Sequence, residues 1–190
     1  ESLGQLQALT KLDLRDCRGL RSLPPELGQL VSLTYLNLSN CTFLTSLPAE
    51  LGQLVALTRL KASFCASLSA LPHTIGDLKA LSWISLRNCK NLHSLPAAIG
   101  KLEALNRLNL QECESLAALP GEIGRLKALS YLSLSNCTSL EALPEEIGGL
   151  VALKELYLND CSKLVVLPDG VGGLSALTTL RLDDCPFLTY

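Results

Sequence analysis

The chain has 190 residues, a formal net charge of −2 and 48% hydrophobic residues, with eight cysteines and no methionine. A near-neutral chain lacks the excess of Lys and Arg with which nucleic-acid-binding and membrane-surface proteins hold anionic partners, so neither partner is expected. No apolar run approaches the ~18 residues of a membrane span, and no signal peptide opens the chain.

One sequence pattern recurs every 24 residues along the whole chain. The cysteines set its register, at Cys17, Cys41, Cys65, Cys89, Cys113, Cys137, Cys161 and Cys185. Around each cysteine the same order of Leu, Pro and Gly returns without an insertion, and the last period stops just after Leu188. A fixed period of this length is typical of repeat proteins. The sequence therefore predicts a single domain over residues 1–190, built from about eight repeats.

Within a period, the elements follow in a fixed order. Leu12 and Leu14 alternate with polar residues, which predicts a strand of about five residues that ends before Cys17. Pro24 has its φ fixed for a first helical turn, and Gly28 is expected to interrupt that turn early. The result is a 3₁₀ or very short helix. A strand and a helical return in 24 residues bring the chain back beside its start, so successive strands should stack in parallel.

The turn L-x-x-L-x-L-x-x-C-x-x-L-x-x-L-P-x-x-I-G-x-L resembles the leucine-rich-repeat family over essentially the whole chain. Within the family it is most similar to the repeats of plant intracellular immune receptors of the nucleotide-binding type. Plant cell-surface receptors usually carry Asn in place of Cys17 and a G-x-I-P step, which the segment Leu20 to Pro24 lacks. The resemblance implies an α/β solenoid: a right-handed superhelix with a parallel β-sheet on the concave face and 3₁₀ or short helical segments on the convex face. It also implies that the cysteines bond neighbouring backbone in the core.

The regular cysteines allow three interpretations: inert buried thiols, disulfides between adjacent turns, and metal ligation. Stacked strands would place them in a column ~4.8 Å apart. Parallel side chains in a column give poor disulfide torsions and do not converge on a tetrahedral metal centre. Buried free thiols are therefore favoured, with no metal and no cofactor expected. Eight reduced thiols in turn favour a reducing compartment, so we expect a cytoplasmic location.

The positions that do not follow the repeat are the outward residues of each strand, and they form the expected binding face. We expect ten residues there to contact a partner: Lys11, Tyr35, Arg59, Lys61, Phe64, Trp83, Arg87, Arg107, Tyr131 and Tyr157. Aromatic residues in alternate turns would lie ~10 Å apart with cations between them. This alternation fits anchors of a binding stripe, because Tyr, Trp and Arg dominate interface energetics. It equally fits a duplicated 48-residue pair of turns, and the two interpretations are compatible.

Charge is uneven along this face. Arg59, Lys61, Arg87 and Arg107 gather in the middle turns, whereas acidic residues gather toward the end of the chain. The pattern would suit a protein partner with an acidic patch. Phe64 departs from the template together with Ala62, which stands where other turns have Leu. It either leans into the space that Ala62 leaves or lies exposed as a further anchor.

Nothing in the sequence predicts catalysis. A Ser or Cys nucleophile would need a nearby His, but His73 and His93, the two histidines, lie on return segments away from the strands. The glycines are single members of the repeat and form no phosphate-binding loop. The expected function is thus non-catalytic protein–protein recognition, and the resemblance adds the sensing part of an immune-receptor-like protein.

No capping repeat is visible at either end of the sequence, although solenoids need terminal caps. Three explanations stay open: a piece of a longer receptor, end-to-end self-association, and a designed repeat scaffold. The last two would make the chain a structural unit rather than a recognition module.

Overall fold

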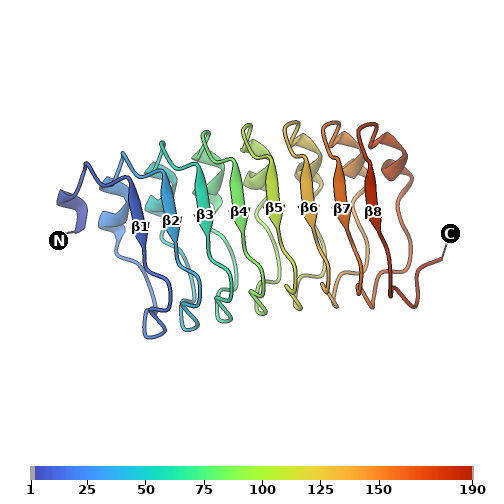
Figure 1. The fold of residues 1–190 in the computed structure, drawn as a ribbon, viewed down its shortest axis with the longest axis horizontal. Helices are drawn as coiled ribbons and strands as arrows, with labels where there is room; N and C mark the ends of the chain where they lie inside the picture. Colours follow the sequence, from blue (N-terminus) through green and yellow to red (C-terminus); the bar gives the residue numbers. More distant parts are fainter. Residues whose placement is uncertain (1–2, 190) are drawn as a thin grey trace.

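The computed structural model describes residues 3–189, which form a single parallel sheet of eight strands in chain order. Figure 1 shows the strands side by side along the long axis, with the chain running from one end to the other. Each strand has three residues: β1 (Lys11–Asp13), β2 (Tyr35–Asn37), β3 (Arg59–Lys61), β4 (Trp83–Ser85), β5 (Arg107–Asn109), β6 (Tyr131–Ser133), β7 (Glu155–Tyr157) and β8 (Thr179–Arg181). The predicted parallel solenoid is confirmed.

One 3₁₀ helix per turn lies behind the sheet (Figure 1), as predicted. The helices are η1 (Leu3–Gln5), η2 (Pro25–Gln29), η3 (Ala49–Gln53), η4 (His73–Asp77), η5 (Ala97–Lys101), η6 (Gly121–Arg125), η7 (Glu145–Gly149) and η8 (Asp169–Gly173). In η2 the amide of Leu27 donates to the carbonyl of Pro24 at 3.0 Å, which closes the tight turn. Pro24 itself is extended, with ψ 151°, so it precedes the helix rather than forming its first turn.

The strands are shorter than the five residues predicted, but the ladder between neighbouring turns continues beyond them. The amide of Leu14 donates to the carbonyl of Asn37 at 2.8 Å, and that of Asp16 to Ser39 at 2.8 Å. At Asp16 the backbone turns to φ 62°, which ends the extended geometry while keeping the hydrogen bonds.

This left-handed position recurs in every turn, with φ between 56° and 62°, at Asp16, Asn40, Phe64, Asn88, Glu112, Asn136, Asp160 and Asp184. Asn and Asp adopt the left-handed region more readily than other residues with a side chain. Their side chains also pair across turns, since the amide of Asn40 donates to Asp16 at 3.0 Å and that of Asn136 to Asp160 at 3.3 Å. Phe64, which we expected to contact a partner, belongs to this column, and the backbone restricts the residue type there.

Leu and Cys columns fill the interior between the sheet and the helices. The six cysteines from Cys41 to Cys161 are buried, and all eight thiols are free. Each buried thiol donates to a carbonyl 27 residues earlier; Cys89, for example, donates to Ala62 at 3.0 Å and Cys113 to Leu86 at 3.2 Å. Burial raises the pKa of the Cys65 thiol to about 12. From Cys41 onward the cysteines thus form the inward column that the resemblance implied, with each thiol bound to neighbouring backbone, whereas Cys17 in the first turn is exposed.

The repeated glycine permits close packing between consecutive helices. A Cβ atom at Gly76 would lie 2.6 Å from the carbonyl oxygen of Ala98, and one at Gly52 would lie 2.7 Å from that of Thr74. Both glycines lie inside their helices, and neither has a positive φ. The expectation that glycine interrupts the helix is therefore wrong: glycine is needed here because the next turn approaches its Cα.

Candidate functional site

The ten residues expected to bind a partner all lie on one side of the sheet, on the strands or just beyond them. We call this surface the sheet face. Its first column joins directly paired residues of neighbouring strands, in the order Lys11, Tyr35, Arg59, Trp83, Arg107, Tyr131, Glu155 and Thr179. The regular register therefore places cations and rings beside one another along the solenoid.

Several of these cations stack on rings from the next strand. The Arg107 guanidinium carbon lies 4.2 Å from the centre of the Tyr131 ring, and the Lys61 ammonium lies 5.9 Å from that of Trp83. Tyr131 also packs against Tyr157, with ring centres 5.5 Å apart and planes tilted by 43°. Such contacts stabilise exposed side chains by about 0.5–1 kcal/mol each, so they order the middle of the sheet face.

A shallow hollow of about 500 Å³ lies over β3 to β6, and we call it the central hollow. It is lined by Arg59, Ser82, Trp83, Asn106, Arg107, Asn109 and Tyr131. The lining has two guanidinium groups, two rings and no carboxylate. A smaller hollow of about 310 Å³ brings Lys11 and Tyr35 together with Arg59 at the adjoining strands.

A further hollow of about 360 Å³ includes Lys61, Phe64 and Arg87. The Phe64 side chain is 39% exposed, and its ring lies 5.6 Å from the Arg87 guanidinium carbon. Ala62 is fully buried, whereas Phe64 is exposed. Of the two alternatives for Phe64, the structure supports an exposed position.

The arginines of the sheet face differ in their partners. Arg15 pairs with Asp13, and hydrogen bonds from Arg15 lower the pKa of Asp13 to about 2. Arg87 binds Glu112 at 2.8 Å, so this predicted partner-binding residue has a structural role as well. Within residues 3–189, by contrast, no carboxylate forms an ion pair with Lys11, Arg59, Lys61 or Arg107.

Tyr157, the last residue of the predicted set, belongs to the acidic end of the sheet face. Its hydroxyl donates to Glu155 at 2.8 Å, and this hydrogen bond raises the pKa of Tyr157. The electrostatic character therefore changes between β5 and β7, from free cations to engaged carboxylates.

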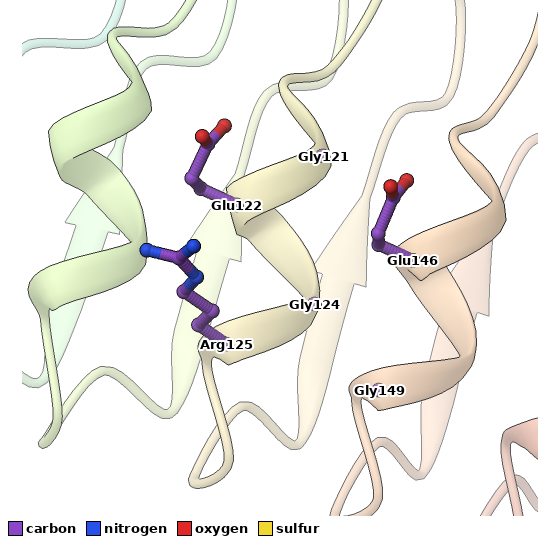
Figure 2. A pocket seen from close by; sticks show the side chains of 6 residues that line it. All are labelled: Gly121, Glu122, Gly124, Arg125, Glu146 and Gly149. Carbon is purple, nitrogen blue, oxygen red and sulfur yellow. The ribbon is translucent and has the colours of Figure 1, made fainter.

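A second kind of hollow lies on the back, between η6 and η7, with a volume of about 370 Å³. Figure 2 shows its lining: Glu122 and Glu146 project in similar directions from equivalent positions, with Arg125, Gly121, Gly124 and Gly149 nearby. At Gly124 and Gly149 the two helices approach so closely that a Cβ atom would clash with the backbone of the neighbouring helix. The groove is thus a consequence of helix packing, and it has none of the rings found in the central hollow.

The two histidines lie outside the strands of the sheet face, on the return segments. His73 begins η4, and the exposed His93 lies within 3.0 Å of the Asn91 carbonyl oxygen through Nδ1. Across the described part of the chain, no three His, Cys, Asp or Glu side chains are grouped to hold a metal ion. None of the helices between residues 3 and 189 is long and apolar enough to span a membrane.

Sequence reasoning missed part of the lining of the central hollow. Ser82 and Asn106 precede their strands, at a position where most turns have Thr or Ser. There the hydroxyl groups bond backward: Thr58 donates to the carbonyl of Thr34 at 2.9 Å, and Ser82 to that of Thr58 at 3.1 Å. Asn106 is the one member of this column that interrupts the hydroxyls between β4 and β6. That break could have drawn attention to Asn106, but not to Ser82, which keeps the hydroxyl and also lines the hollow.

Stacked parallel strands, buried thiols and one exposed sheet define a repeat solenoid. The family model described as "Leucine-rich repeat region" matches residues 1–117, and that described as "Leucine Rich Repeat" matches residues 128–150. The chain belongs to the leucine-rich-repeat family.

Three solved structures illustrate the similarity. The leucine-rich-repeat domain of the type III effector XopL is 30% identical, with a TM-score of 0.84 over 93% of this chain and 61% of its own length. The Arabidopsis receptor kinase HAESA, in complex with the peptide hormone IDA and the co-receptor SERK1, is 22% identical (TM-score 0.56, 85% of this chain and 31% of its own). Toll from Drosophila, in complex with Spatzle, is 24% identical, with a TM-score of 0.68 over 94% of this chain and 27% of its own length. The last two show a shared fold alone. No curated protein matches the chain.

Proposed function

We propose that this chain is a non-catalytic protein-recognition module that binds a partner through the sheet face, centred on the central hollow. The observation that carries the proposal is the gathering of Arg59, Trp83, Arg107 and Tyr131 around one exposed hollow. Rings and guanidinium groups of this kind dominate binding energy at protein interfaces. Leucine-rich-repeat domains commonly serve as protein-recognition modules, and Toll and HAESA were solved with protein or peptide partners.

The remaining predicted residues extend this surface to both sides. Lys11 and Tyr35 lie toward β1, Lys61, Phe64 and Arg87 line the hollow of about 360 Å³, and Tyr157 lies on β7. We place the contact area on these residues because, except at Phe64, the solenoid does not specify the identity of the side chain.

The setting of this recognition is part of the proposal. The cysteine-containing repeat with its Leu-Pro step resembles the turns of plant intracellular immune receptors, which supports a sensing role in a receptor of that kind. A free thiol in every turn, buried in the six turns from Cys41 to Cys161, supports a reducing compartment and hence a cytoplasmic location.

A capture experiment with two matched triple variants tests the function. The face variant combines Trp83→Ala, Arg107→Ala and Tyr131→Ala, and the back variant combines Glu122→Ala, Arg125→Ala and Glu146→Ala. Captured proteins are identified, purified and titrated against each form. We expect a partner that binds the unmodified chain and the back variant with equal affinity and loses at least about tenfold with the face variant. A partner that binds all three equally contradicts the proposal.

The alternative is a structural scaffold whose copies associate end to end. It predicts a mass that rises with concentration in light scattering and that the face variant leaves unchanged. A constant monomer mass would reject it.

A further inference from the structure

We propose that the segment recognised at the central hollow is an extended acidic peptide, whose carboxylates recur every third residue and bind Arg59 and Arg107. The inference rests on the proposed function and specifies the chemistry of the partner. The segment runs along the solenoid, across β3, β4 and β5, rather than parallel to the strands.

The first argument is the charge of the hollow. The chain carries a net charge of −2, yet Arg59, Lys61 and Arg107 form no ion pair among residues 3–189. By contrast, Arg15, Arg87 and Arg181 on the same face each bind a carboxylate. Like charges left together repel, and an anionic partner relieves that repulsion on binding. Charge complementarity therefore selects an acidic partner.

The second argument is the order of these side chains before binding. Arg107 stacks on Tyr131 at 4.2 Å, and Lys61 lies 5.9 Å from the centre of the Trp83 ring. A guanidinium that rests on a ring keeps its N–H edges free for a two-pronged bond to a carboxylate. Because the side chain is already held, less rotamer entropy is lost when the carboxylate binds.

The third argument is spacing. Arg59, Trp83 and Arg107 are directly paired on β3, β4 and β5, so the two arginines are two strand spacings apart, ~9.6 Å. A peptide in the polyproline II conformation advances ~9.3 Å in three residues. In a β-strand, side chains on the same face recur every two residues, which is an advance of ~6.8 Å and does not match the arginine spacing. Carboxylates three residues apart can therefore reach both arginines, with the intervening residues over Trp83.

The acidic end of the sheet face limits how far such a segment extends. Glu155 is paired with Tyr131 across β6 and β7, next to the arginine side of the hollow. A third carboxylate placed beyond Arg107 would approach Glu155 and be repelled. The acidic part of the peptide should thus end over β6.

A random dodecapeptide library displayed on phage tests the inference separately from the function. Peptides are selected on the unmodified chain and counter-selected on the face variant. Enrichment of Asp or Glu at positions i and i+3 is the expected result. Face-dependent peptides without acidic residues would overturn the inference and leave protein recognition intact. If no peptide depends on the face, both the inference and the proposed function are contradicted.

A titration then tests the chemistry and the spacing directly. The probe is a fluorescent peptide of four Glu-Pro-Pro units, compared by anisotropy with an isomer that has its four Glu together. We expect Arg59→Gln or Arg107→Gln to weaken binding about three- to tenfold, and the isomer to bind more weakly. Arg125→Gln removes an equal charge from the back of η6 (Figure 2) and should leave binding unchanged. Equal binding of the isomer, or tighter binding of single-stranded DNA at the same arginines, would overturn the proposal.

Discussion

The column of thiols inside the solenoid and the first column of the sheet face recur with the same 24-residue period, yet they vary very differently. The inner column has Cys in all eight turns, whereas the outer column contains Lys, Tyr, Arg, Trp, Glu and Thr. Each inner thiol from Cys41 onward donates to a backbone carbonyl of the preceding turn, as Cys65 does to Leu38 at 3.1 Å. Water can satisfy the outer side chains instead. Variation along the repeat therefore marks positions that the fold leaves to function.

Two further columns show that exposure alone does not identify such positions. The left-handed residue at the end of each strand is often exposed, but its φ restricts the residue type. The helix glycines are restricted by the helix of the next turn. The comparison is thus between positions that the backbone constrains and positions that it does not, and the predictions below test that division.

The largest expected effect concerns pH. The folded pKa of the buried thiols lies above the ordinary 9.0, about 12 for Cys65 and for Cys161 and higher for Cys89. Because the unfolded chain loses these protons first, stability that is intact below pH 9 is lost as pH rises toward the folded pKa values. Above pH 9 the free energy of unfolding should fall by about 1.4 kcal/mol per buried thiol and pH unit, so several thiols together should make the protein much less stable in alkali. Urea unfolding followed by circular dichroism under reducing conditions measures this slope.

Cys89→Ala provides the control for this prediction. It removes one thiol that donates to the Ala62 carbonyl, so it lowers stability at pH 7 by about 1–3 kcal/mol. Above pH 9 the free energy of unfolding of this variant should fall less steeply than that of the unmodified chain, the two slopes differing by about 1.4 kcal/mol per pH unit. A slope equal to that of the unmodified chain would show that the thiols do not govern the alkaline limit.

The glycine column gives the next largest effect. Gly76→Ala places a Cβ 2.6 Å from the Ala98 carbonyl oxygen, and the two helices must separate to admit it. We expect a loss of about 2–3 kcal/mol in the free energy of unfolding. Gly172 occupies the same position of the repeat in η8, but nothing lies within 4 Å of a Cβ there. Gly172→Ala should therefore be neutral or stabilising by up to about 1 kcal/mol. Equal effects at both positions would contradict the packing explanation.

The left-handed column predicts a reciprocal pair of smaller changes. Phe64 has φ 62° and Asn88 has φ 58° at equivalent positions. Phe64→Asn should stabilise the chain by about 0.5–1 kcal/mol, because relief of backbone strain exceeds the lost contact with Arg87. Asn88→Phe should destabilise it by about 1–2 kcal/mol, since it adds strain and removes the hydrogen bond to Glu112. Thermal or urea unfolding of the two variants would reveal effects of opposite sign; a loss in both would show that the Phe64 ring contact matters more than its backbone.

The sequence predicted the solenoid well, because the fold depends on an inward column that repeats in every turn. Leu60 and Cys65, for example, are fully buried, as their place in the repeat predicts. The left-handed position could not be recognised as readily, because Phe64 and Glu112 obscure an otherwise Asn- and Asp-rich column. The glycine was assigned to helix termination for a similar reason, since its real constraint is a carbonyl oxygen of the next turn, which lies 22 residues away along the chain.

The central hollow was predicted only in part, and the reason is physical. The register of Arg59, Trp83 and Arg107 follows from the 24-residue period, so their proximity could be inferred. Which arginine stays free of a carboxylate depends on side-chain rotamers, because Arg87 reaches Glu112 on the next turn while Arg107 stacks on Tyr131. The 24-residue period fixes the backbone position of each side chain, whereas the contacts that the side chain makes depend on which residues stand at the neighbouring positions.

The smallest expected effect lies in that hollow and tests the division most directly. Arg59→Gln should change the free energy of unfolding by no more than about 0.5 kcal/mol, because this side chain is exposed and forms no ion pair within residues 3–189. Arg107→Gln should cost no more than about 1 kcal/mol, because Arg107 is exposed and unpaired in the same way but also stacks on Tyr131. Urea unfolding at pH 7 measures this, with Arg87→Gln as the comparison that breaks the bond to Glu112. A loss above about 1 kcal/mol at Arg107 would mean that its stacking on Tyr131 supports the sheet. The hollow would then belong to the constrained positions, and a loss of binding in the same variant could no longer be assigned to the partner alone.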